Sequence, residues 1–280
     1  MKKLVVIPNV NKDKGFSVTD QVVTKLICLG FDVYVDDSIG YQKDGVDLYA
    51  DFPDDIDLIV VIGGDGSVID ASRIAVDRDI PILGVNLGRM GYLTEVELDG
   101  ISALDALKSG EYCVTEKMLL SVEMGNGDVC ERLAVNDVAV ARDRFLHIAD
   151  IKIEDSINNA VKLRADGVVL STPQGSTAYS FSAGGPILAH DVEGILLTPV
   201  SSHSFFNRSV LFNSTENIRI TNVGELPLHV SVDGRCIATL GHTEYCNVKR
   251  ASKNVKILTF KKNSMFTSLF KKMRILGDID

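Results

Sequence analysis

A short loop of three glycines and one carboxylate, Gly63–Ser67, contains the residue types with the most direct chemical consequence. The apolar run Leu58–Ile62 comes immediately before it, and a helical pattern begins after it. This order is typical of a buried strand, a tight turn and the N-terminus of a helix, where backbone N–H groups and the helix dipole bind phosphate. Glycine permits the close approach that a Cβ would block. The predicted phosphate-binding residues are Gly63, Gly64, Gly66 and Ser67.

Asp65 is the unusual member of this loop, because a carboxylate repels the phosphates that the loop would bind. It becomes useful if it holds Mg²⁺ or accepts a proton from an attacking hydroxyl, and both roles indicate phosphoryl transfer. We therefore predict Asp65 as the catalytic residue. The alternative is a turn at the end of a strand, in which Asp65 only caps a helix. The loop is not a P-loop, and it lacks the third glycine of the dinucleotide-binding fingerprint.

A second polar stretch, residues 166–186, combines hydroxyl side chains with glycines at high density. Such residues suit hydrogen bonding to a flat polar ligand such as a base or a carboxamide, although a Ser/Gly-rich loop without a ligand has the same composition. The pair Asn136-Asp137 lies between two apolar segments and fits either an Asx turn or a fork onto ribose hydroxyls. Tyr92, in a glycine-containing loop, either stacks on a base or packs beneath that loop.

Composition limits the class of protein. The net charge of −9 over 280 residues argues against general nucleic-acid binding. The five cysteines are odd in number and form no Cys-x-x-Cys, which predicts reduced thiols and a cytoplasmic protein. The histidines lack metal-site spacing, so no protein side chain is assigned to a metal. We expect neither a signal peptide nor a membrane segment, because no apolar run approaches spanning length.

The elements that must position these residues change in character near residue 116. Before it, apolar strands alternate with amphipathic helices, which predicts a doubly wound, Rossmann-like α/β domain with its ligand crevice at the carboxyl ends of the strands. Here we expect a helix capped by Ser17 and a surface connection over 37–56. After residue 116, period-two segments and turns predict a β-rich, sandwich-like domain. The predicted domains are 1–115 with 255–280, where a helix around 266–273 would pack back, and 116–254.

Taken in order, several segments resemble the NAD kinase family along nearly the whole chain. The matching segments are Gly63–Ser67, residues 86–94, Asn136-Asp137, residues 166–187, and Leu197-Thr198-Pro199 with His203 and Arg208; residues 266–277 are similar too. The resemblance implies transfer of the γ-phosphoryl group of ATP to the adenosine 2′-hydroxyl of NAD, which forms NADP, with a divalent cation that we expect to be Mg²⁺. It places the family's general base on Asp65, in agreement with the electrostatic argument.

The resemblance also implies a set of NAD contacts, with Asp166 toward the nicotinamide and Tyr92 near the adenine. Ser67 and Tyr92 stand where the family often has Thr or Asn and Phe, respectively. Arg235 stands where a glutamine often contacts NAD, and there it could equally touch a phosphate or a neighbouring subunit. The implied NAD-binding residues are Asp65, Gly66, Tyr92, Asn136, Asp137, His147, Arg164, Asp166, Thr177, Ala178, Tyr179, Ser180, Phe181, Ser182 and Arg235.

The family further implies a two-domain homo-oligomer, a dimer or a tetramer, with NAD and ATP as substrates; we expect no nucleic-acid and no membrane partner. Two other functions compete with this one. A non-catalytic NAD(P)-sensing module would bind NAD without consuming ATP, and the intact Asp65 argues against it. A kinase acting on a lipid or a sugar would share the glycine loop, but the hydroxyl-rich residues 172–182 suit a nucleotide better than an acyl chain.

Overall fold

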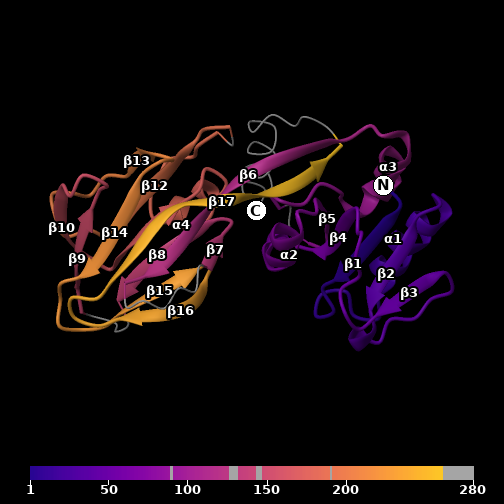
Figure 1. Ribbon diagram of the computed structural model, residues 1–280, viewed down its shortest axis with the longest axis horizontal. Coiled ribbons are helices and arrows are strands. Elements are labelled where there is room, and N and C mark those ends of the chain that lie inside the picture. Colours follow the sequence, from indigo (N-terminus) through magenta and orange to yellow (C-terminus); the bar gives the residue numbers. More distant parts are fainter. Residues whose placement is uncertain (89–90, 126–131, 143–146, 190, 261–280) are drawn as a thin grey trace, which may run out of the picture. The chain divides into compact units, whose positions relative to one another are not determined.

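The computed structural model describes residues 1–88, 91–125, 132–142, 147–189 and 191–260. The chain divides into two compact units, Met1–Glu116 with the chain from Val255 onward, and Lys117–Asn254. Two long strands, β6 (Cys113–Met124) and β17 (Tyr245–Thr259), belong in part to each unit (Figure 1). The helix expected around 266–273 lies outside the described residues.

The first unit is a parallel sheet with the strand order β5-β4-β1-β2-β3, and the end of β17 pairs in parallel with β5. Its strands are β1 (Lys3–Pro8), β2 (Asp32–Asp36), β3 (Val46–Tyr49), β4 (Leu58–Gly63) and β5 (Ile82–Asn86). Its helices are α1 (Ser17–Cys28), α2 (Asp65–Arg78) and α3 (Asp105–Ser109), with the 3₁₀ helices η1 (Asp37–Ile39) and η2 (Leu98–Leu104).

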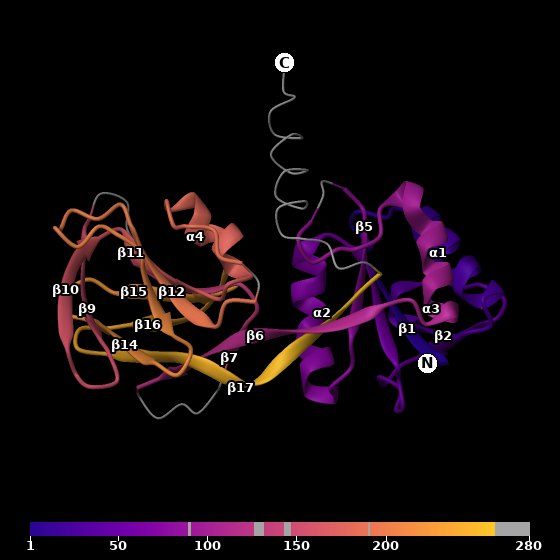
Figure 2. The same cartoon turned by 90° about the horizontal axis from the view of Figure 1, so that it is seen from above.

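The two main helices cover opposite faces of this sheet. The crossovers β1-α1-β2 and β4-α2-β5 step in opposite directions along the strand order, so right-handed connections put α1 and α2 on different sides, as Figure 2 shows. Val22, Val23 and Leu26 of α1 pack in one apolar cluster with the sheet, whereas α2 buries Val68 and Ala71 on the other face. Each fully buried aliphatic side chain contributes about 1.5–3 kcal/mol relative to exposure, so the sheet is a firm support for the loops at its ends.

The second unit consists of two antiparallel sheets packed on a common core. One sheet has the order β10-β9-β14-β17, with β10 (Ala160–Ala165), β9 (Ala149–Glu154) and β14 (Asn217–Asn222). The other has the order β13-β12-β11-β8-β15-β16, formed by Val210–Asn213, Gly194–Val200, Gly167–Ser171, Asp137–Arg142, Leu228–Val232 and Arg235–Leu240. The short strand β7 (Arg132–Ala134) pairs with β6. Alternate residues of both sheets, such as Ile151 and Val140, share one buried cluster, which makes the unit a sandwich.

These two architectures confirm the predicted combination of a doubly wound α/β domain and a β-rich, sandwich-like domain. The alternation of apolar strands and helices was sufficient for the first, and the period-two pattern for the second. Among the described residues, no helix combines the length and the apolar character needed to cross a membrane.

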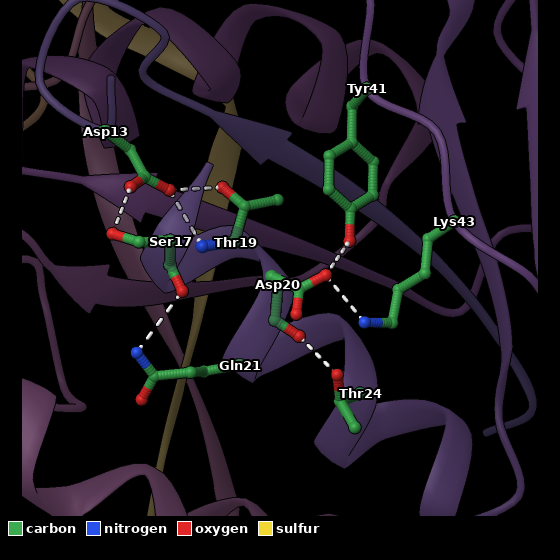
Figure 3. A network of polar contacts seen from close by, with 8 residues as sticks. All are labelled: Asp13, Ser17, Thr19, Asp20, Gln21, Thr24, Tyr41 and Lys43. Atoms are coloured by element: carbon green, nitrogen blue, oxygen red, sulfur yellow. Dashed lines mark hydrogen bonds and ion pairs between the residues drawn. The ribbon is translucent and has the colours of Figure 1, made fainter. Parts of the chain in front are cut away.

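The cap of α1 differs from the expectation. The helix begins at Ser17, but its cap position is Phe16, and the first turn is satisfied by Asp13 (Figure 3). Asp13 Oδ2 accepts hydrogen bonds from Thr19 N–H at 2.7 Å and Thr19 Oγ1 at 2.6 Å, and its Oδ1 accepts one from Val18 N–H at 3.1 Å. Burial alone would raise the pKa of Asp13, but these hydrogen bonds outweigh it and hold the pKa below its usual range. Asp13, and not Ser17, therefore caps the helix.

The expected surface connection over 37–56 is wrong in part, because it contains the strand β3, which pairs in parallel with β2. The segment is tied to α1 by Asp20, which accepts hydrogen bonds from Lys43 Nζ at 2.6 Å and Tyr41 Oη at 3.3 Å (Figure 3). Polar residues are common in an edge strand, where they discourage pairing with other chains. Because β3 contains such residues, its sequence lacks the apolar run by which the other strands were predicted.

Candidate active site

The glycine loop joins the buried strand β4 to the 14-residue helix α2. A Cβ on Gly63 would overlap the Ser67 side chain, so the turn requires glycine there. The first N–H groups of a helix have no acceptor within the helix, and they carry the positive end of its dipole. The structure thus brings Gly63, Gly64, Asp65, Gly66 and Ser67 together at a strand end with the properties of an anion site.

Asp65 is held by the loop that follows β5. Its Oδ2 accepts a hydrogen bond from the Tyr92 N–H at 2.8 Å, and its Oδ1 accepts one from the Leu93 N–H at 2.9 Å. A Cβ on Gly91 would overlap Asp65 Oδ1, so only glycine lets the loop come this close. Each carboxylate oxygen keeps a further lone pair for a substrate hydroxyl or a cation. The site therefore presents an oriented carboxylate at the start of a helix.

The loop that holds Asp65 is itself anchored by Asn86 at the end of β5. The Asn86 side chain is fully buried; its Nδ2 donates to the Gly88 carbonyl at 3.1 Å and to Glu97 Oε2 at 2.9 Å, and its Oδ1 accepts from the Gly88 N–H at 3.2 Å. Burial, and second the charge of Asp65, raise the pKa of Tyr92, so the Tyr92 phenol is neutral near pH 7. Glu97, which helps to orient Asn86, could not be identified from the sequence.

The donors around Asp65 decide whether a divalent cation fits there. In the described part of the chain, no three His, Cys, Asp or Glu side chains gather as a metal site. Thr94 Oγ1 is buried, lacks a hydrogen-bond partner among the described residues and lies on the same side of Gly91 as Asp65. One carboxylate and an unsatisfied hydroxyl fit a Mg²⁺ ion that keeps most of its ligands from water and phosphate, as Mg²⁺ usually does.

In the second unit, the structure places Asn136 and Asp137 beside the residue 172–179 segment. Thr172 Oγ1 donates to the Val135 carbonyl at 2.7 Å, and a Cβ on Gly175 would overlap the Asn136 backbone. The Tyr179 N–H donates to Asp137. The densely polar stretch and the Asn-Asp pair, which lie apart in the sequence, therefore form one cluster.

Asp233 organises this cluster from the turn between β15 and β16. Its Oδ1 accepts from the Asn136 N–H at 2.8 Å and the Asp137 N–H at 3.1 Å, and its Oδ2 accepts from the Val135 N–H at 2.9 Å. Burial, and second the neighbouring Asp233 charge, raise the pKa of Asp137 to about 7. Asp233 was not predicted from the sequence. The pair Asp233-Gly234 is a signal for a tight hairpin turn, and both residues have the positive φ that such a turn requires.

The 177–182 run divides between outward and inward side chains. Tyr179 and Phe181 are 42% and 54% exposed, whereas Ser180 is buried and its Oγ lies 2.8 Å from Thr198 Oγ1. Thr177 Oγ1 donates to the Gln174 carbonyl at 3.1 Å. Ala178 joins the short helices η3 (Gly175–Thr177) and α4 (Tyr179–Ser182), and Ser182 is exposed. Tyr179, Phe181 and Ser182 are thus accessible to a ligand, whereas the Ser180 hydroxyl bonds within the fold.

A cavity of about 380 Å³ is lined by Arg142, His147, Asp150 and Glu225 together with apolar residues such as Leu226. Arg142 Nη2 lies 3.0 Å from Asp166 Oδ1, and Arg164 Nε lies 3.1 Å from Asp150 Oδ1. His147 lines this cavity, whereas Asp166 and Arg164 contact it only through their ion pairs with Arg142 and Asp150, which the sequence did not single out. The remaining predicted residue, Arg235, is exposed at the start of β16.

Comparison with known proteins gives a consistent result for both units. The family model of the ATP-NAD kinase N-terminal domain matches residues 4–112, and that of the ATP-NAD kinase C-terminal domain matches residues 135–260. The chain is 34% identical to the NAD kinase of Caldanaerobacter subterraneus subsp. tengcongensis over 284 residues, which covers 98% of this chain and 99% of that protein. It is 32% identical to the NAD kinase of Geobacter sulfurreducens over 280 residues, with the same coverage of 98% and 99%.

Solved structures share the fold. Yeast NADH kinase complexed with NADH superposes with a TM-score of 0.85 at 21% identity, covering 100% of this chain and 89% of that one. The NAD kinase from Archaeoglobus fulgidus in complex with ATP gives a TM-score of 0.72 at 23% identity, covering 97% and 98%.

Proposed function

This chain belongs to the NAD kinase family, and from that premise we propose how its residues divide the work of the reaction. The reaction is the ATP-dependent phosphorylation of NAD: the γ-phosphoryl group moves to the adenosine 2′-hydroxyl, and NADP and ADP are the products. The single observation that supports the division of roles best is the placement of Asp65, a carboxylate fixed by two backbone N–H groups at the N-terminus of α2.

Asp65 is the general base in this proposal. The 2′-oxygen forms a bond to the γ-phosphorus, the bond between that phosphorus and the β,γ-bridging oxygen breaks, and the hydroxyl proton passes to Asp65. The Tyr92 and Leu93 N–H groups keep the carboxylate oriented for this transfer. Because phosphoryl transfer proceeds through a loose transition state, positioning and charge neutralisation supply most of the acceleration and the base supplies the rest.

The donor phosphates lie along Gly63–Ser67 in this proposal, where the helix dipole favours negative charge. The metal is Mg²⁺ that enters with ATP, because the donors around Asp65 suit an ion with few protein ligands. When bound, Mg²⁺ neutralises charge on the phosphates.

The acceptor NAD is assigned to the clusters described above. The cavity of the second unit, which Arg142, His147 and Asp150 help to line, suits the polar nicotinamide end, and Tyr92 in the first unit suits the adenine by stacking. In this proposal Asp137, with Asn136, accepts hydrogen bonds from ribose hydroxyls. The proposed NAD-binding residues are Asp65, Gly66, Tyr92, Asn136, Asp137, His147, Arg164, Asp166, Thr177, Ala178, Tyr179, Ser180, Phe181, Ser182 and Arg235. Of these, the buried Ser180 would act by holding its neighbours rather than by touching NAD.

We also propose a homo-oligomer, a dimer or a tetramer, because the resemblance to the family implies one. A cytoplasmic location is proposed because the cysteines are expected to be reduced; among the described residues, four cysteines are free thiols.

The experiment is incubation of the protein with NAD, ATP and Mg²⁺, with NADP measured by an NADP-specific dehydrogenase. We expect NADP and ADP in equal amounts, and NADP formation at least about 100-fold slower when Asp65 is replaced by Asn. Binding of NAD without ATP consumption would support the sensing module, and phosphorylation of a lipid or sugar but not of NAD would support the other kinase class. Replacing NAD by NADH, or ATP by polyphosphate, then defines the acceptor and the donor.

A further inference from the structure

The turn that follows β1 lies directly against the glycine loop. The Asn9 N–H donates to the Ile62 carbonyl of β4 at 2.8 Å, and Asn9 Nδ2 donates to Ser67 Oγ in the first turn of α2 at 2.9 Å. Asn9 Oδ1 accepts hydrogen bonds from the Asn11 and Lys12 N–H groups, both at 3.2 Å. One side chain therefore joins the start of α2 to the backbone of Lys12.

The other end of this turn is fixed as well, because Asp13 caps α1 (Figure 3). Lys12 stands between the two anchors. A Cβ on Gly64 would lie 3.3 Å from Lys12 Nζ, so the ammonium group lies over the glycine at the N-terminal cap of α2. The backbone of Lys12 is held on both sides, and its side chain reaches the surface where an anion would bind.

The location of this ammonium group is electrostatically unusual. The N-terminus of a helix carries a partial positive charge, which repels a cation. Among the described residues, the Lys12 side chain forms no ion pair and no hydrogen bond, so no carboxylate of this part of the chain, Asp65 included, compensates the repulsion. An anion shared between Lys12 and the helix would remove this conflict, because both groups would then attract the same charge.

We propose that Lys12, on the turn whose backbone Asn9 holds, binds the phosphate chain of ATP above Gly64. The inference rests on the proposed use of the glycine loop for the donor. The ammonium group supplies a point charge to the phosphates, as the lysine of other phosphate-binding loops does. It also offsets the repulsion between these phosphates and Asp65, and so allows a carboxylate and a polyanion to share one loop.

The test compares Lys12→Met with Lys14→Met, which removes the same charge from an exposed lysine of the same turn. For Lys12→Met we expect kcat/KM for ATP to fall about 10- to 100-fold, the range for losing a hydrogen bond to a charged group. KM for NAD and the thermal midpoint should hardly change, because the side chain is exposed. Lys12→Arg should restore most of the loss, and Lys14→Met should behave as the wild type.

A direct readout separates binding from turnover. In titration calorimetry, inorganic tripolyphosphate with Mg²⁺ should bind Lys12→Met about 10- to 100-fold more weakly than it binds Lys14→Met. Equal binding and equal kcat/KM in the two variants would overturn the inference, and so would a loss confined to KM for NAD. If the wild type forms no NADP at all, the proposed function fails instead, and weaker tripolyphosphate binding by Lys12→Met would still assign the anion site.

Discussion

A carboxylate can accept a proton beside a polyphosphate only if its position is fixed. At Asp65, hydrogen bonds from backbone N–H groups fix that position. The N–H groups of Tyr92 and Leu93 each donate a hydrogen bond to one Asp65 oxygen. Because Gly91 has no side chain, the loop can come this close to the carboxylate. Backbone donors cannot rotate away as side chains do, which keeps the remaining lone pairs aimed in one direction. The orientation of Asp65 is therefore a property of two loops and not of one residue.

Single residues of this kind could be proposed from the sequence only where their neighbours drew attention to them. Asp65 was recognisable because glycines flank it, and Asn136-Asp137 because apolar segments do. Asp233 binds the Asp137 N–H from a position 96 residues away, and Lys12 reaches Gly64 from another strand end. Nothing in the local pattern distinguishes either from an ordinary surface charge, because their roles arise from contacts that only the folded chain makes.

Asp137 gives a pH prediction. Its pKa is raised to about 7 in the folded chain, above the unfolded value near 3.8, because it is buried beside Asp233. Between these two pKa values the folded state holds a proton that the unfolded state has lost. The contribution of Asp137 to the free energy of unfolding is therefore complete below pH 4 and is lost as the pH rises through 7. Asp137→Asn stays neutral and can still accept the Tyr179 hydrogen bond. It should be more stable than the wild type at pH 8, by at most about 4 kcal/mol, with a smaller difference at pH 5.

The measurement is the thermal midpoint of both proteins between pH 5 and pH 8.5. The exposed Asp51→Asn is the control, and its difference from the wild type should not depend on pH. A difference for Asp137→Asn that is constant across this range would show that Asp137 is ionised throughout.

At the scale of elements, the contacts that begin a helix were less predictable than the helix itself. The periodicity of residues 17–28 indicated α1, because the apolar spacing follows from burial on the sheet. Its cap is Asp13, which reaches the first turn from the preceding loop, so the rule that the cap stands immediately before the helix selected Ser17 instead. The edge strand β3 was missed for a related reason: only pairing with β2, and not an apolar run, defines it.

The α1 cap can be tested by two substitutions. Asp13→Asn puts an amide N–H₂ or a weaker acceptor in place of a carboxylate that takes hydrogen bonds from Val18 and Thr19, and we expect a loss of about 1–3 kcal/mol in the free energy of unfolding at pH 7. Ser17→Ala should cost much less, because the Ser17 hydroxyl is exposed and makes only a 3.4 Å contact with Asp13.

Because the pKa of Asp13 is held below its usual value, the contribution of this group is present above pH 4 and is lost as the pH falls further. The difference in the free energy of unfolding between Asp13→Asn and the wild type should therefore become smaller below pH 4. If denaturation curves showed that Ser17→Ala lowers the free energy of unfolding more than Asp13→Asn does, Ser17 would be the cap, as the sequence predicted.

At the scale of the whole molecule, the residues proposed for the reaction are divided between the two units. The first unit contains the glycine loop and Asp65, and the second contains the polar clusters proposed for NAD. The change of periodicity near residue 116 was visible in the sequence, because a parallel sheet and a sandwich bury their strands differently. The return of β17 to β5 was not visible locally, since a strand pattern does not reveal its partner.

The central claim, that Asp65 accepts the proton of the 2′-hydroxyl, is tested most directly by Asp65→Asn in the complete protein. Asp77→Asn, an exposed acid in the same helix, serves as the matched control. With saturating ATP and Mg²⁺, kcat for NADP formation should fall at least about 10²-fold in Asp65→Asn, while the dissociation constant for NAD measured by calorimetry changes little. Turnover in Asp65→Asn close to that of Asp77→Asn would contradict the account.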